Sequence, residues 1–173
     1  MTGIITDFFS QIVYIFGYIA KNYRILIDDI THGTINPSIA MPDEVKKSLM
    51  KRITPMPERG RELSKIFKNG SNFVFAKKVW PNLSYIFGAG TANFAPYDKI
   101  LSKCYIGKDV DRIYSGVVAS EGLWSFPIFK NNPNTLLATK SVFFEFLPVE
   151  AGDDFTKIVT IDKVKVGKTY ELI

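Results

Sequence analysis

The chain of 173 residues contains one cysteine and one histidine, and this scarcity excludes several kinds of site. Cys104 has no second thiol with which to form an internal disulfide, which fits a reducing compartment such as the cytoplasm. No histidine lies near it in sequence, so we interpret it as a buried thiol and not a nucleophile. His32 has no neighbouring ligand residues. The sequence therefore predicts neither a zinc site nor a Cys–His dyad.

The chain also lacks a long uninterrupted apolar run. Asp7, Ser10 and Gln11 interrupt the apolar residues of the first twenty positions, and no basic segment or small-residue cleavage site accompanies them. The remaining run is too short to cross a bilayer. We expect no membrane span here, but an amphipathic helix whose broad apolar face needs a partner. An alternative is that residues 4–20 bind a membrane surface.

Charge of one sign is not in large excess, since the formal net charge is +5. The basic residues of positions 46–68 alternate with polar residues in helix-like segments, which is typical of solvated helix faces. No motif that combines basic and aromatic residues to read nucleic acid is present. We therefore expect no nucleic-acid partner.

The residues that are present predict an α/β fold whose N-terminal half is helical. Apolar spacing predicts a helix from residue 4 to about 28 that ends near Gly33. Pro42 and Pro57 open two further helices, because proline is favoured in the first helical turn. We expect residues 1–72 to be helical and residues 73–173 to be a β-rich α/β region.

Runs of apolar residues in the second half predict a mixed β-sheet. The segment 73–80 is ambiguous between helix and strand. The expected strands are Leu83–Phe87, Arg112–Val118, Ser141–Leu147, Lys157–Ile161 and Thr169–Ile173. A helix is expected at Ala95–Leu101, between the first two strands. Because the chain starts in an apolar helix and stops in a strand-like run, we interpret residues 1–173 as a single partial domain, truncated at both ends.

Two short polar and glycine-rich stretches follow two of the predicted strands. Gly88-Ala89-Gly90-Thr91 follows the first strand, and Ala119-Ser120-Glu121-Gly122 follows the strand that begins at Arg112. Ligands bind where neighbouring parallel strands end in open α/β sheets, so we expect both stretches at one sheet edge. A hydroxyl, a carboxylate and glycines are the groups that hold a phosphate and its metal ion. Each stretch by itself also fits an ordinary turn.

Six motifs in order give the chain a resemblance to one family. They are Asp29-Ile30 with Gly33, Trp80-Pro81-Asn82, Gly90–Phe94, Ala119–Gly122, Phe144-Glu145-Phe146-Leu147-Pro148, and Val164–Leu172 with Val166-Gly167-Lys168 and Tyr170-Glu171-Leu172. Together they resemble motifs of the auxin-responsive Gretchen-Hagen-type acyl acid amido synthetases of the adenylate-forming superfamily. The resemblance implies that the chain is a slice of the N-terminal domain of such an enzyme.

The resemblance implies a ligase that uses ATP and Mg²⁺ to convert a carboxylic acid into its acyl adenylate, which an amino acid then attacks. It implies that Glu121 holds the metal, that Ser120 donates to a phosphate, and that Ala119 and Gly122 lie near the nucleotide. The stretch Gly88–Thr91 is implied to flank the adenine or the acyl group. Phe144 and Phe146 are expected in the core.

The chain departs from the family pattern in parts that adenylation requires. Val117 stands where the family has an aromatic residue. The upstream phosphate loop, the downstream ribose-binding aspartate and the C-terminal domain are absent. We therefore predict that the chain is inactive alone, and that its partners are a carboxylic acid, an amino acid and the remainder of its own domain. The alternative is a non-catalytic binding module derived from the same family.

Overall fold

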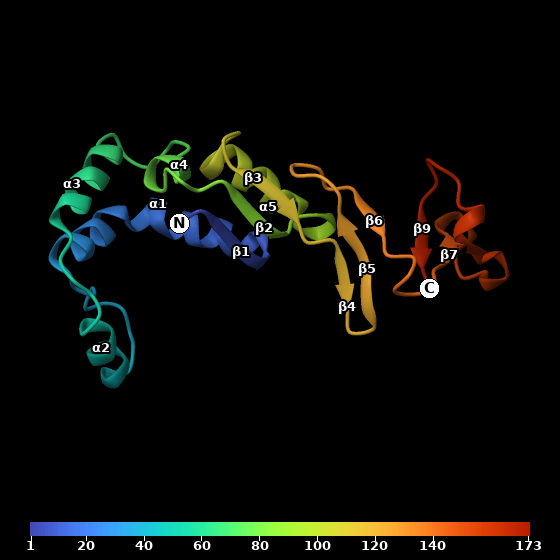
Figure 1. Ribbon diagram of the computed structural model, residues 1–173, viewed down its shortest axis with the longest axis horizontal. Coiled ribbons are helices and arrows are strands. Elements are labelled where there is room, and N and C mark those ends of the chain that lie inside the picture. Colours follow the sequence, from blue (N-terminus) through green and yellow to red (C-terminus); the bar gives the residue numbers. More distant parts are fainter. The chain divides into compact units, whose positions relative to one another are not determined.

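The computed structural model describes residues 1–173 and divides the chain into two compact units (Figure 1). The first unit comprises residues 1–115 and 129–133, and the second comprises residues 116–128 and 134–173. The first boundary between the units thus lies after residue 115. The sequence predicts the change from helical to β-rich structure at residue 72. The interpretation of the chain as a single partial domain stays a prediction.

A parallel sheet of three strands forms the centre of the first unit. Its strands are β1 (Gly3–Phe8), β2 (Tyr85–Ala89) and β3 (Asp111–Tyr114), and β2 lies in the middle. Parallel neighbours require crossover connections. The helical segments are α1 (Phe9–His32), α2 (Asp43–Met50), α3 (Pro57–Ile66), α4 (Ala76–Val79) and α5 (Ala95–Ile100), with a 3-10 turn at Ala92–Phe94 and a π-helical turn at Leu101–Ile106.

The expected first helix is confirmed at its end and wrong at its start. α1 ends at His32, and Gly33 adopts the left-handed conformation that closes it. Residues 3–8, however, form β1, which aligns Ile4 with Ile86 and Ile5 with Phe87. The spacing of apolar residues here fits both the helical and the strand period. The strand that pairs with it, β2, lies about eighty residues further along the chain. The helices predicted to open at Pro42 and Pro57 are present.

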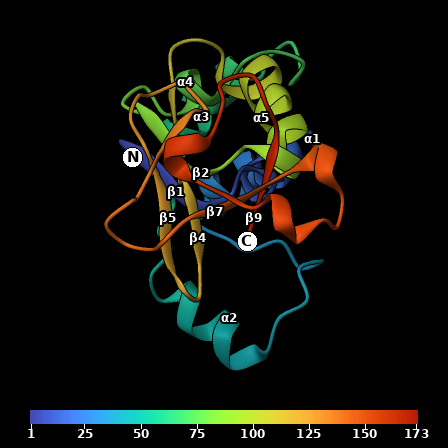
Figure 2. The same ribbon diagram turned by 90° about the vertical axis from the view of Figure 1, so that its right-hand side faces the viewer.

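Aromatic side chains dominate the core of the first unit. The Phe16 ring of α1 packs against Phe75, Trp80 and Tyr105 at centroid distances of 5.8, 5.8 and 5.7 Å. Buried residues of the helices join Ile86 of β2 and Tyr114 of β3 in the same cluster. Figure 2 shows α1 and α5 side by side, and these two helices are in contact. The high aromatic content of the sequence is therefore concentrated in a packed interior.

The second unit consists of two small antiparallel sheets. One contains β4 (Val117–Ala119), β5 (Gly122–Pro127) and β6 (Thr135–Leu137), and the other contains β7 (Glu145–Pro148), β8 (Val159–Thr160) and β9 (Tyr170–Leu172). Three 3-10 turns accompany the second sheet, at Val149–Ala151, Phe155–Lys157 and Ile161–Lys163. The three C-terminal strands are confirmed in shorter form, whereas β5 and β6 were not expected.

The strand predicted for residues 112–118 is wrong as a single element. β3 ends at Tyr114, and Gly116 has a φ of 74°, a conformation that interrupts a strand. β4 then begins at Val117 and pairs antiparallel with β5 in a different sheet. A β-carbon at Gly116 would lie 2.2 Å from the carbonyl oxygen of Ser125, so only glycine fits at this position between β3 and β4.

Two further expectations concern exposure to solvent and lipid. No helix of this protein is long and apolar enough to traverse a bilayer. Cys104 is exposed, so the prediction of a buried thiol is wrong. It lies on the π-helical turn, one residue before the half-buried Tyr105, on a side of the turn that faces solvent.

Candidate functional site

The Ser120–Glu121 pair occupies the turn of the β4–β5 hairpin. Ala119 pairs with Gly122 across the turn, and Val117 pairs with Ser125 further along the ladder. Both turn side chains are exposed to solvent. Gly122 has a φ of 152°, which a glycine adopts freely where the chain reverses. The hairpin therefore presents one hydroxyl and one carboxylate at its tip.

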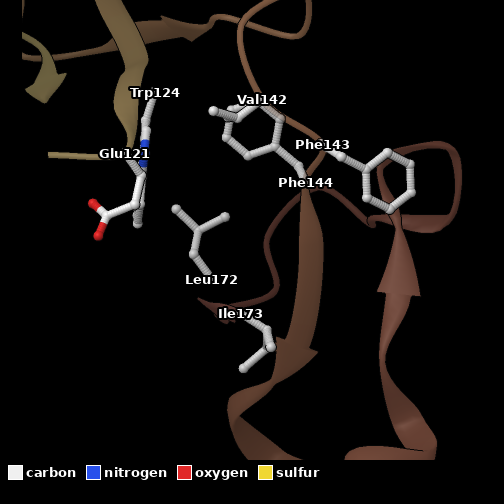
Figure 3. Close-up of a pocket in the computed structure, with 7 residues that line it drawn as sticks. All are labelled: Glu121, Trp124, Val142, Phe143, Phe144, Leu172 and Ile173. Atoms are coloured by element: carbon white, nitrogen blue, oxygen red, sulfur yellow. The ribbon is translucent and has the colours of Figure 1, made fainter. Parts of the chain in front are cut away.

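A small pocket of about 170 Å³ adjoins Glu121 within the second unit. Its other walls are Trp124, Val142, Phe143, Phe144, Leu172 and Ile173 (Figure 3). In Figure 3 the carboxylate of Glu121 points away from Leu172 and Val142, so charge lies at the rim and apolar surface lies inside. The indole nitrogen of Trp124 is buried without a hydrogen-bond partner. An unpaired buried donor of this kind is energetically costly.

The donor set at the hairpin suits magnesium in part. Mg²⁺ is commonly bound through one or two carboxylates together with substrate phosphates and water. Glu121 can supply one such ligand. No group of three histidine, cysteine, aspartate or glutamate side chains comes together anywhere in residues 1–173 to hold a metal ion. The hairpin thus presents a single carboxylate and not a complete protein cage for a metal ion.

The second predicted stretch, Gly88–Thr91, lies at the carboxyl end of β2 in the first unit. Gly88 and Gly90 are buried. A β-carbon at Gly90 would lie 2.3 Å from the Phe9 ring, and one at Gly88 would lie 2.8 Å from Thr6. These glycines therefore admit the start of α1 against the end of β2. Their role beside a nucleotide, with that of Ala89 and Thr91, stays a prediction.

The structure does not place the two stretches on one sheet edge. Gly88–Thr91 includes the last two residues of β2 in the parallel sheet and the two residues after it, whereas Ser120, Glu121 and Gly122 belong to an antiparallel hairpin of the other unit. The residues next to the end of β3 are Ser115 and Gly116. The prediction that both stretches lie at one sheet edge is wrong because it treats residues 112–118 as one strand. Gly116 separates this segment into β3 and β4. Within the hairpin, the predicted residues Ala119 to Gly122 do lie together.

A polar cluster in the first unit was missed in the sequence. The Arg112 guanidinium donates to both carboxylate oxygens of Asp98, at 3.1 and 3.0 Å, and joins β3 to α5. Burial, and then the neighbouring Asp98 charge, raises the pKa of Tyr114 to about 12. The phenol is thus neutral at physiological pH. No local pattern signals this cluster, because Asp98 and Arg112 lie on different elements.

Comparison with known proteins decides the family. The model of the GH3 family N-terminal domain matches residues 1–110, and that of the GH3 family central domain matches residues 135–173. The chain belongs to the GH3 family. The resemblance seen in its motifs is thereby confirmed.

Relatives of this GH3 chain are acyl acid amido synthetases. The probable indole-3-acetic acid-amido synthetase GH3.11 of Oryza sativa subsp. japonica is 26% identical over 179 residues, which cover 96% of this chain and 30% of the relative. The indole-3-acetic acid-amido synthetase GH3.3 of Arabidopsis thaliana is 27% identical over 173 residues, which cover 96% of this chain and 29% of the relative. The chain therefore spans about 30% of the length of these relatives.

Solved structures confirm the predicted fold. The GH3.15 acyl acid amido synthetase matches with a TM-score of 0.74 and 22% identity, covering all of this chain and 31% of the solved one. The same synthetase in complex with 2,4-DB matches with a TM-score of 0.77 and 22% identity, covering all of this chain and 30% of the solved one. The α/β slice predicted from the sequence is thus the fold of a region of these enzymes.

Proposed function

We propose that this chain is a portion of an ATP-dependent acyl acid–amino acid ligase that carries the serine–glutamate turn of its nucleotide site. The carrying observation is that family matches flank the β4–β5 hairpin on both sides, with Ser120 and Glu121 exposed at its tip. In the proposed reaction the acid carboxylate attacks the α-phosphorus of ATP and displaces pyrophosphate. The amine of an amino acid then attacks the acyl adenylate, which yields an amide and AMP.

Each hairpin residue has a proposed role in this chemistry. Glu121 supplies one oxygen ligand to Mg²⁺, which neutralises charge on the phosphate oxygens. The Ser120 hydroxyl donates a hydrogen bond to a phosphate oxygen. Ala119 and Gly122 bring backbone close to the nucleotide, and the stretch Gly88–Thr91 flanks the adenine or the acyl group. We propose the cytoplasm as the location, since Cys104 is an exposed free thiol.

The isolated chain is proposed to be inactive because its hairpin supplies only part of the phosphate-binding groups. One hydroxyl and one carboxylate leave most of the phosphate charge without donors. A second candidate function, a non-catalytic binding module, is favoured by the exposed Val117 in β4, which replaces an aromatic residue of the family pattern. The two candidates differ in whether the hairpin contributes to adenylation when the remaining parts of a synthetase are present.

A graft experiment tests the proposal. This chain replaces the matched region of the GH3.15 acyl acid amido synthetase, and acid-dependent exchange of pyrophosphate into ATP is measured. Glu121→Gln should lower the exchange by about 100-fold or more, since the metal loses its charged ligand. It should also raise the Mg²⁺ concentration needed for half-maximal exchange.

The control is Glu150→Gln, which removes an exposed carboxylate that pairs with Lys168 in the same unit. It should leave the exchange unchanged. A folded graft that shows no exchange supports the binding module instead. An active graft that tolerates Glu121→Gln contradicts the role of the hairpin carboxylate.

A further inference from the structure

A polar pocket of about 590 Å³ lies in the first unit, at the end of the sheet where β3 begins. Small-molecule sites commonly have volumes of about 300–1,000 Å³. Because β3 runs parallel to β2, this pocket and the stretch Gly88–Thr91 lie at opposite ends of the strands. The proposed function gives the pocket no role. Its lining includes Ser102, Lys103, Lys108, Arg112 and Asn131.

Hydrogen bonds hold the walls of this pocket in place. The Asn131 backbone nitrogen donates to the Arg112 carbonyl at 2.7 Å, and Asn131 Oδ1 accepts from the Arg112 backbone nitrogen at 2.9 Å. The Gly107 backbone nitrogen donates to the Ser102 carbonyl at 3.0 Å, and its φ of 66° ends the π-helical turn. The pocket is therefore formed before a ligand arrives, which lowers the entropic cost of binding.

Two lysine ammonium groups at the pocket are unpaired. Lys103 and Lys108 are exposed, and neither side chain makes a hydrogen bond or an ion pair within the protein. A third cation, the Arg112 guanidinium, holds Asp98. Asp111 is occupied as well, since both of its carboxylate oxygens accept hydrogen bonds from residues 129–133. These two carboxylates therefore do not neutralise the lysines.

One carboxylate close to the pocket has no partner. Asp109 is exposed and lies between Lys108 and the buried Val110. A single carboxylate can neutralise only one of the two lysines. The pocket thus keeps an excess of positive charge, and a concave site lined by charge of one sign attracts ions of the other sign.

We propose that this pocket binds an anion with two or more phosphoryl groups, such as inorganic pyrophosphate or the polyphosphate chain of a nucleotide. Lys103 and Lys108 are its ligands, because each ammonium group donates up to three hydrogen bonds and binds phosphate as a point charge. A singly charged carboxylate would satisfy only one of them, whereas a polyphosphate presents charged oxygens to both. This site does not depend on the proposed function.

Calorimetric titration of the 173-residue chain with pyrophosphate tests the site. The buffer contains EDTA, so that no divalent ion joins the ligand to the β4–β5 hairpin. We expect one ligand per chain. The double variant Lys103→Gln and Lys108→Gln should raise the dissociation constant by about 10-fold or more, because two charged donors are lost. Glu121→Gln should bind pyrophosphate as the unsubstituted chain does.

The matched control is the double variant Lys65→Gln and Lys68→Gln. It removes two exposed lysines of the same unit and changes the net charge by the same amount. Its dissociation constant should stay within about 2-fold of the original. Equal weakening by both double variants would show that pyrophosphate is attracted by diffuse charge, and this overturns the proposal. Absence of saturable binding, or its loss in Glu121→Gln, overturns it too.

A second measurement uses the unsubstituted chain and needs no variant to fold. Lysine side chains are acetylated with an N-hydroxysuccinimide ester, and the modified peptides are quantified by mass spectrometry. Pyrophosphate should slow the acetylation of Lys103 and Lys108 by about 5-fold or more relative to Lys65 and Lys68. Protection by ATP as well identifies a nucleotide as a further source of the phosphate chain, and protection by pyrophosphate alone identifies the inorganic ion. Equal rates at all four lysines with either ligand contradict the site.

Discussion

At the scale of single residues, two glycines that suggest a ligand loop also have a packing role. Gly88 and Gly90 lie where α1 begins against the end of β2. Phe9, the first residue of α1, is completely buried and its ring occupies the place of a Gly90 β-carbon. A glycine that precedes a helix in an α/β unit can therefore be required by close packing of the chain on itself, independently of any nucleotide.

A pair of alanine substitutions measures this packing. Gly90→Ala should lower the free energy of unfolding by about 1–3 kcal/mol, because the new methyl group overlaps a ring that cannot move away. Gly17→Ala is the matched change within α1, where the new methyl group meets only the Tyr105 hydroxyl at 3.4 Å. It should raise stability by roughly 0.5–1 kcal/mol, since alanine is the better helix former. Urea unfolding followed by circular dichroism checks both.

The origin of the Gly90 effect is tested by trimming the opposing ring. If the overlap with Phe9 is the cause, Phe9→Leu and Gly90→Ala together should cost less than the sum of the two single changes. Strictly additive losses would contradict the packing role of Gly90 and leave the nucleotide role as the reason for this glycine.

At the scale of elements, the connection between β3 and residues 129–133 depends on pH. Asp111 accepts hydrogen bonds from Lys130 Nζ at 2.8 Å and from Asn131 Nδ2 at 2.7 Å. These bonds hold the pKa of the Asp111 carboxyl below its ordinary value of 3.8. The folded state therefore favours the charged form. The resulting stabilisation is fully present above the ordinary pKa and is lost as the pH falls through the lowered one.

We expect Asp111→Asn to destabilise the protein at pH 7 by a few tenths to about 1 kcal/mol, since solvent screens this partly exposed pair. The difference from the unsubstituted protein should shrink toward zero as the pH is lowered from 4 to 2. Thermal unfolding at each pH measures it. Asp153→Asn, at an exposed turn of the second unit, is the control. It should leave the stability at pH 7 unchanged. A stability difference for Asp111→Asn that stays constant down to pH 2 would contradict the assignment.

Helices with terminal signals were predicted well from the sequence. Pro57 in the first turn of α3 and Gly33 after α1 have local effects on the backbone, so a single sequence reveals them. β1 was assigned to a helix because its identity as a strand depends on pairing with β2, far away along the chain. Local periodicity carries no information about such a partner.

The candidate site shows the same limit. The types of residue at the tip, Ser120 and Glu121, were predicted, and the family resemblance was confirmed. Their placement was wrong because Gly116 was read as part of a strand, although its positive φ separates β3 from β4. Glycine fits both a strand and a break, and the close contact with Ser125 that requires the break arises only after the hairpin has formed.

Trp124 and Leu172, which line the pocket beside Glu121, were not predicted for a related reason. They come together only when the two small sheets of the second unit have formed.

At the scale of the whole molecule, the two units have very different cores. The first contains a continuous cluster of fifteen buried hydrophobic residues drawn from helices and sheet. In the second unit the buried side chains are Ser125, Phe144, Phe146 and Leu147. The second unit also has fewer than 60 residues, a size at which the area buried on folding gives only marginal stability. The unpaired indole nitrogen of Trp124 reduces that stability further.

We therefore expect the second unit to unfold before the first. The two tryptophans report on the units separately, since Trp80 stacks with Phe16 in the first core and Trp124 lies in β5. In Trp80→Phe the remaining fluorescence follows the second unit, and in Trp124→Phe it follows the first. The urea midpoint reported by Trp124 should be lower than that reported by Trp80 by about 1 M or more, which corresponds to a few kcal/mol at ordinary denaturant slopes. Circular dichroism of each variant checks that neither substitution has itself displaced the transition. Coincident midpoints would show that the units unfold as one cooperative body, and the hairpin that carries Glu121 would then be as stable as the aromatic core.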